Sequence, residues 1–276
     1  MLPNHRFLTC QNLEIHYTEW GEPDAPVVIC WHGLTRTGRD FDELAEALAT
    51  HYRVICPDTP GRGLSEWSET PLEHYIVPFY AQIALDLAKQ LGIEQFKWVG
   101  TSMGGLIGMV VAALAPERVQ KLVLNDVGPE VPVAAVERIR TYAGSQPSFN
   151  SVSELEAWLR QVYIPFGENT DAFWRRMAMT SARRTADGKV TLHYDVRLVM
   201  PFENYTGDAT FWPFWPSLAC PILVIRGELS DLLLPAQVER MLAENAYVQA
   251  VVIPKVGHAP ALAVPEQIKI VSDFLG

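Results

Sequence analysis

The sequence predicts an α/β fold: a mostly parallel central sheet flanked by helices on both faces, with an inserted, mostly helical cap. Three observations lead to this prediction. Strand-like and helix-like segments alternate along the chain. The strand-like segments are mostly continuous apolar runs, which is typical of parallel strands that are covered on both faces. One long interval, residues 128–215, interrupts the alternation, and an insertion of this size between sheet strands is typical of a cap or lid.

The elements before the interval follow one another as strand and helix. The first strand alternates apolar and polar residues, the later strands are buried β-branched runs, and the helices carry apolar residues at helical spacing. Gly92 closes the second helix. Strands are predicted at 13–21, 25–33, 52–58, 96–100 and 119–127, and helices at 41–49, 79–92 and 106–115.

After the interval the alternation resumes. Strands are predicted at 221–228 and 250–257, and helices at 235–245 and 265–275. The interval itself contains helix-like pieces, a turn at Asp187-Gly188 and many aromatic residues. The predicted layout is therefore a core formed by residues 1–127 and 216–276, with a cap formed by residues 128–215. The aromatic residues of the cap could form its own core or contact a hydrophobic substrate.

Composition limits the class of protein. The chain has 276 residues, of which 49% are hydrophobic and 20% charged, as in ordinary globular proteins. Its formal net charge of −10 argues against a nucleic-acid or anionic-membrane partner, which would need a basic face. The N-terminus lacks a basic segment followed by an apolar one, and no apolar run is long enough to span a bilayer, so a cytoplasmic location is expected.

The cysteine and histidine patterns do not indicate a metal site. No pair of cysteines forms a CxxC motif, and the seven histidines include no HExxH motif. The four cysteines, Cys10, Cys30, Cys56 and Cys220, are expected to be buried free thiols, because most lie in or beside apolar strand-like runs. No cofactor is expected either.

The segment around Ser102 carries the strongest chemical signal. Gly100 and Gly104 flank Ser102 in a G-x-S-x-G pattern, after a predicted strand and before a predicted helix. In such a nucleophile elbow the serine hydroxyl is exposed above the sheet at a helix N-terminus. The unpaired NH groups at that terminus favour a developing oxyanion. Ser102 is therefore the candidate nucleophile.

A serine nucleophile needs a base and an orienting acid. Of the two histidines that follow Ser102, His193 falls in the predicted cap, where a structural role is expected, and His258 follows a strand and a glycine at the rim of the sheet. His258 is the predicted base. Asp231, which follows the strand 221–228, is the preferred acid. Two alternatives stay open: Asp126, at the end of the strand 119–127, and Glu228.

The oxyanion hole needs two NH donors. One is expected from Met103, directly after the nucleophile, and the other from Leu34, in the loop after the strand 25–33. Gly33 allows that loop to come close. His32 is expected to anchor the loop through hydrogen bonds and not to act as a base.

Over nearly its whole length the chain resembles the α/β-hydrolase fold superfamily. The resemblance is carried by "HGLT" (32–35), "PDTPGRGLS" (57–65), "GTSMGG" (100–105), "RGELSD" (226–231) and "GHAP" (257–260). In similar sequences the acid lies three residues after the glycine of a GxxD pattern, whereas Asp231 is four residues after Gly227. Haloalkane dehalogenases and epoxide hydrolases of this superfamily carry an aspartate at the elbow, so Ser102 argues against both activities.

The predicted function is hydrolysis of carboxylic esters with small to medium apolar acyl groups, through Ser102, His258 and Asp231 and an acyl-enzyme. Carbon-carbon hydrolases of ring-cleavage products share the serine elbow and are the first alternative, although Thr35-Arg36-Thr37 and Ala259 differ from their usual pattern. Lactonase, thioesterase and a non-enzymatic ligand receptor are further alternatives. Arg183 and Arg184 are expected to be solvated helix charges or, alternatively, to bind a substrate carboxylate. The partner is a small-molecule substrate; the sequence does not predict the oligomeric state.

Overall fold

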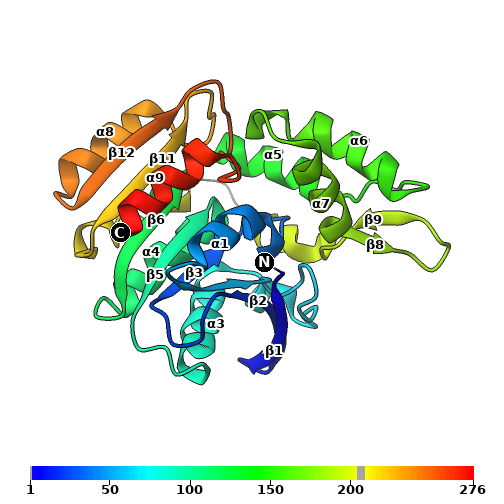
Figure 1. Cartoon of the computed structure of the whole chain (residues 1–276). Coiled ribbons are helices and arrows are strands. Elements are labelled where there is room, and N and C mark those ends of the chain that lie inside the picture. Colours follow the sequence, from blue (N-terminus) through cyan, green and yellow to red (C-terminus); the bar gives the residue numbers. More distant parts are fainter. Residues whose placement is uncertain (1, 204–208) are drawn as a thin grey trace.

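A computed structural model describes residues 2–203 and 209–276 of the chain. Its centre is an eight-stranded sheet with the order β1-β2-β4-β3-β5-β6-β11-β12 (Figure 1). β1 and β2 form an antiparallel ribbon at one edge, and β2 also pairs antiparallel with β4. The strands are β1 (Asn4–Cys10), β2 (Leu13–Trp20), β3 (Val27–Trp31), β4 (Arg53–Pro57), β5 (Phe96–Thr101), β6 (Val119–Asn125), β11 (Ile222–Gly227) and β12 (Val248–Ile253).

The six strands from β4 to β12 run parallel to their neighbours. In the central strands, Thr101 at the end of β5 lies opposite Asn125 at the end of β6, and Asn125 lies opposite Ile225 of β11. The residues that follow these strands therefore meet at one edge of the sheet. In open parallel sheets this carboxyl edge is where ligands bind.

Helices cover both faces of the sheet, which explains the continuous apolar strands. One buried cluster packs α1 and α9 on the first face, and a second packs α3, α4 and α8 on the other. The predicted α/β fold class is thus confirmed. The helices are α1 (Asp42–Leu48), α2 (Pro71–His74), α3 (Val77–Gln90), α4 (Met103–Leu114), α8 (Pro235–Glu244) and α9 (Pro265–Leu275).

The chain between β6 and β11 leaves the sheet, and in Figure 1 its three α-helices, drawn in green, gather to one side of it. This inserted segment also holds a short hairpin and several single turns of 3₁₀ helix. Residues 204–208, inside the predicted cap, lie outside the described residues. The segment contains β7 (Glu130–Val131), α5 (Val133–Ala143), α6 (Val152–Val162), η2 (Ile164–Phe166), α7 (Asp171–Ser181), β8 (Ala182–Arg184), β9 (Val190–Leu192), η3 (Val196–Phe202), β10 (Ala209–Thr210) and η4 (Trp215–Ser217).

The expected burial of the cysteines is confirmed for three of the four and is wrong for Cys220. All four cysteines are free thiols; Cys10, Cys30 and Cys56 are buried, and Cys220 is half-buried. Within residues 2–203 and 209–276, no helix has the length and apolar character that crossing a bilayer requires.

Candidate active site

Ser102 lies in the tight turn between β5 and α4. Its backbone has φ 52° and ψ −118°, a conformation that costs energy for a residue with a side chain. The flanking glycines are required by close backbone contacts. A Cβ at Gly104 would lie 1.9 Å from the carbonyl oxygen of Trp31, and one at Gly100 would lie 2.3 Å from the carbonyl oxygen of Gly104. The predicted elbow is therefore present, with Ser102 half-buried at the N-terminus of α4.

His258 follows β12 and reaches Ser102 across the carboxyl edge of the sheet. Its Nε2 lies 3.0 Å from Ser102 Oγ, and its Nδ1 lies 2.7 Å from Asp126 Oδ2. The first distance allows proton transfer between serine and imidazole, and the second fixes the ring. The three side chains come from loops after three strands, β5, β6 and β12, and are separated by up to 156 residues.

Asp126 is completely buried, and its carboxylate accepts three hydrogen bonds. Oδ1 accepts from the backbone NH of Gly227 at 2.8 Å, and Oδ2 accepts from Ser230 Oγ at 2.7 Å as well as from His258. These donors compensate for the loss of hydration that a buried carboxylate otherwise suffers. Ser230 and Gly227 belong to the loop where the acid was expected, so this loop supports the acid instead of supplying it.

The prediction that Asp231 orients His258 is wrong. The side chain of Asp231 is 61% exposed and forms an ion pair with Arg138 of α5 at the surface. Gly227 is followed three residues later by Ser230, and the additional residue before Asp231 turns its carboxylate away from the sheet edge. The alternative Glu228 is also elsewhere, because it accepts from the backbone NH of Lys255. The remaining alternative, Asp126, is the one that the structure places beside His258.

The two predicted oxyanion donors lie in segments next to Ser102. Met103 is the first residue of α4, so its NH precedes the helical hydrogen-bond ladder, and the positive end of the helix dipole is located there. A Cβ at Gly33 would lie 3.7 Å from Ser102 Cβ, so the loop after β3 passes directly beside the serine. Leu34 follows in that loop, and its role as second donor stays a prediction.

Two buried side chains, His32 and Arg62, hold the loop after β3 through hydrogen bonds. His32 donates from Nδ1 to the carbonyl of Gly33 at 2.6 Å and accepts at Nε2 from the NH of Thr59 at 2.9 Å. Burial lowers the pKa of His32 to about 4, so the ring is neutral and anchors the loop, as predicted. Arg62, also fully buried, donates from Nε to the carbonyl of Leu34 at 2.8 Å. This hydrogen bond fixes the position of the Leu34 carbonyl.

One short part of the inserted segment contacts both loops of the site. The NH of Gly257, next to His258, donates to the carbonyl of Pro165 in η2 at 2.8 Å. Just before η2, the Tyr163 hydroxyl lies 3.5 Å from Thr35 Oγ1, and the Arg36 guanidinium lies 5.1 Å from the centre of the Tyr163 ring. Residues 163–165 therefore touch the histidine loop on one side and the loop after β3 on the other.

Other predicted residues of the segment lie elsewhere. Arg183 and Arg184 belong to the strand β8, so the expectation that they are helix charges is wrong. Arg184 donates to the carbonyl of Gly188 within the hairpin, and the Arg183 guanidinium lies 5.2 Å from the centre of the Trp67 ring. His193 does not meet Ser102; its carbonyl accepts from the NH of Gly63.

The arrangement has the parts that nucleophilic acyl transfer needs. A hydroxyl touches an imidazole, a buried carboxylate accepts a hydrogen bond from the imidazole, and the serine stands at a helix N-terminus. In the part of the chain that the structure describes, no three histidine, cysteine or acidic side chains are grouped as metal ligands would be.

Comparisons with known proteins identify the family of the chain. Residues 26–262 match the family described as the alpha/beta hydrolase fold. A 3-hydroxybutyrate-oligomer hydrolase from Cupriavidus necator is 44% identical over 268 residues, which cover 94% of this chain and 91% of the relative. A pimeloyl-[acyl-carrier protein] methyl ester esterase from Vibrio campbellii is 29% identical, with 89% and 92% covered. The crystal structure of an alpha/beta hydrolase from Novosphingobium aromaticivorans superposes with a TM-score of 0.88 at 36% identity, covering 99% and 98% of the two chains.

The buried neutral state of His32 predicts a loss of stability in acid. In the unfolded chain the pKa of a histidine is about 6.5, whereas in the folded protein that of His32 is about 4. The unfolded state therefore binds the proton more readily, and stability falls as the pH falls from 6.5 towards 4. Between pH 7 and pH 5 the expected loss from this group is about 2 kcal/mol.

Urea unfolding of the parent and of His32→Gln at both pH values measures this effect. The other titrating groups are shared, so the difference in unfolding free energy between the two proteins should shrink by that amount at pH 5. A difference that stays constant would show that His32 titrates normally in the folded protein.

Proposed function

Because the chain belongs to the α/β hydrolase fold family and is a hydrolase of that family, we propose that it cleaves carboxylic esters through Ser102, His258 and Asp126. The observation that carries the proposal is the continuous contact from Asp126 through His258 to Ser102, with bonds of 2.7 and 3.0 Å. Each bond is short enough for the role it would have in an acyl transfer.

The proposed reaction proceeds in two halves. Ser102 Oγ attacks the ester carbonyl carbon while His258 Nε2 takes the hydroxyl proton, and the NH groups of Met103 and Leu34 stabilise the oxyanion. The carbon–oxygen bond to the alcohol then breaks, and His258 returns the proton to the leaving alkoxide. In the second half His258 takes a proton from water, the hydroxide attacks the acyl-enzyme, and the acid leaves as Ser102 Oγ regains its proton.

Asp126 would act through the imidazole without giving up or taking a proton. Its bond to Nδ1 holds the tautomer in which Nε2 can accept, and its charge stabilises the imidazolium formed during the reaction. Burial strengthens this interaction, because there is no water to compete for the carboxylate. The bonds from Gly227 and Ser230 fix the carboxylate in the correct plane.

For the substrate, we propose short oligomeric esters of 3-hydroxy acids. This rests on the relative from Cupriavidus necator, which acts on 3-hydroxybutyrate oligomers and aligns over nearly the whole of both chains. Such esters have small, fairly apolar acyl units, the class that the sequence predicts. The inserted segment, proposed to span residues 128–215 as a cap, would close over the acyl unit, since its residues 163–165 already contact both loops of the site.

Removal of the nucleophile should abolish ester turnover. We expect Ser102→Ala to lower kcat on 3-hydroxybutyrate dimers and on p-nitrophenyl butyrate by a factor on the order of 10⁶, since the hydroxyl forms the covalent bond. A panel that adds a thioester, a lactone and a vinylogous diketone would identify carbon-carbon or other acyl chemistry. Substantial residual activity of Ser102→Ala on an ester that the parent cleaves would refute the assignment.

The two candidate acids should behave differently. Asp126→Asn is expected to lower kcat about 10⁴-fold, because the amide favours the wrong imidazole tautomer. Asp231→Asn loses only an exposed ion pair with Arg138, which contributes about 0–1 kcal/mol, and should keep the parent's kcat. It is the matched control, since both substitutions remove one carboxylate charge. The reverse order of activities would restore Asp231 as the acid.

A further inference from the structure

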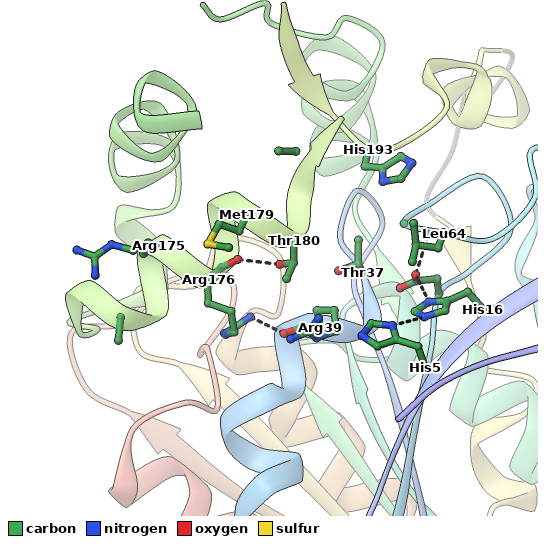
Figure 2. Close-up of a pocket in the computed structure, with 14 residues that line it drawn as sticks. His5, His16, Thr37, Arg39, Leu64, Arg175, Arg176, Met179, Thr180 and His193 are labelled. Atoms are coloured by element: carbon green, nitrogen blue, oxygen red, sulfur yellow. Dashed lines mark hydrogen bonds and ion pairs between the residues drawn. The ribbon is translucent and has the colours of Figure 1, made fainter. Parts of the chain in front are cut away.

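A cavity lies between the β1–β2 ribbon and α7. It has a volume of about 660 Å³, large enough for a small organic ligand. Figure 2 shows Met179 and Thr180 of α7 on one side, His16 and Leu64 on the other, and Thr37 between them. The described residues that line it include none of Ser102, Asp126 and His258. It is therefore separate from the triad.

Thr37 contributes an unused hydroxyl to this cavity. The residue is only 4% exposed, and among the described residues none forms a hydrogen bond with its Oγ1. A buried hydroxyl without a partner destabilises the folded protein unless something else satisfies it. Since Thr37 lines the cavity, a ligand in the cavity could supply the missing partner.

The carboxylate that lines the cavity already accepts hydrogen bonds from other groups of the protein. Asp58 is the one carboxylate among the lining residues that the structure describes. Its Oδ2 accepts from His16 Nδ1 at 2.7 Å and from the NH of Leu64 at 2.9 Å, and its Oδ1 accepts from the NH of Gly38 at 2.7 Å. His16 Nε2 in turn lies 2.8 Å from His5 Nδ1. Both carboxylate oxygens of Asp58 are therefore engaged within the protein.

Basic side chains line the same cavity from two sides. Arg39 and Arg176 stand on one wall, held in place by ion pairs with Asp42 and Glu43, and His193 stands opposite, on the chain that follows β9. Burial lowers the pKa of His193, which favours the neutral ring with its one NH donor. The available groups are thus mainly hydrogen-bond donors, and they match a ligand whose polar end carries acceptor oxygens.

Part of the lining is apolar and shapes the other end of the ligand. Leu64 and Met179, both more than half exposed, and the nearby Ala182 present hydrocarbon and thioether surface to the cavity. A ligand that fits both parts has a carboxylate at one end and a short aliphatic body. Such sites, mostly apolar with a few convergent polar groups, are typical of small-molecule binding.

We propose that this cavity is a second binding site, which takes a short-chain aliphatic carboxylate through Thr37 and His193. A carboxylic acid is also what the hydrolysis of an ester releases. Only this link to the reaction product rests on the proposed function. Binding of a carboxylate to the cavity does not depend on it, and a protein without any esterase activity could still bind the probe.

The experiment is a titration of the full-length protein with sodium hexanoate, observed by NMR of methionine methyl groups labelled with ¹³C. Met179 reports on the cavity and Met103 on the active site, so one spectrum separates the two sites. The Met179 signal should shift and saturate. Thr37→Val and His193→Leu should each weaken binding about tenfold or more, because each removes a hydrogen bond to a charged group.

Several controls make the result decisive. Thr141→Val removes a surface hydroxyl of α5 that bonds within its own helix, and it should leave hexanoate binding unchanged. Thr37→Val should fold as stably as the parent, since the hydroxyl that it removes has no partner among the described residues. Hexanamide and hexanol, which lack the charge, should bind weakly.

Four outcomes would overturn the proposal. They are a Met179 signal that does not respond, a response confined to Met103, equal affinity in the parent and in both cavity variants, and hexanamide binding as tightly as hexanoate. Esterase activity is assayed separately on the same samples, so a failure of the proposed function is distinguishable from a failure of this site.

Discussion

The hydrogen bond between His258 Nδ1 and Asp126 Oδ2 is the contact on which the active-site geometry depends. It joins the loop after β12 to the end of β6 and skips β11, which lies between them in the sheet. The loop after β11 fills that gap, because Gly227 and Ser230 donate to the same carboxylate. The carboxylate of Asp126 thus connects the ends of three neighbouring strands, β6, β11 and β12. Ser102, at the end of the adjacent strand β5, joins them through its contact with His258.

The loops of the site are held in place by buried side chains and by the inserted segment. His32 and Arg62 are both buried, and each forms a hydrogen bond with a backbone carbonyl of the loop after β3. The inserted segment adds a second constraint through Pro165 and Tyr163. Preorganisation of this kind means that donors need not be reoriented when charge develops, which is how such sites lower a barrier.

Short sequence patterns were sufficient to predict the parts of the site that depend on residues adjacent in sequence. The elbow at Ser102 could be predicted because strand, glycines and helix are adjacent in sequence, and His258 because few histidines follow. The acid could not, since a one-residue difference in the loop after β11 decides whether a side chain faces the sheet edge or Arg138. The usable signal was Ser230 at the expected acid position, together with Asp126 at the end of the strand beside the elbow. The cavity between the β1–β2 ribbon and α7 has no sequence signature, because its walls come from segments that are far apart in the chain.

Proton NMR of the His258 imidazole in the parent and in two variants tests the assignment of Asp126 most directly. A strong bond to a buried carboxylate shifts the Nδ1 proton far downfield and protects it from exchange with water. We expect this signal in the parent and in Asp231→Asn, and its loss in Asp126→Asn. A signal that survives in Asp126→Asn, or that disappears in Asp231→Asn, would contradict the assignment of Asp126 and with it the geometry described for the site.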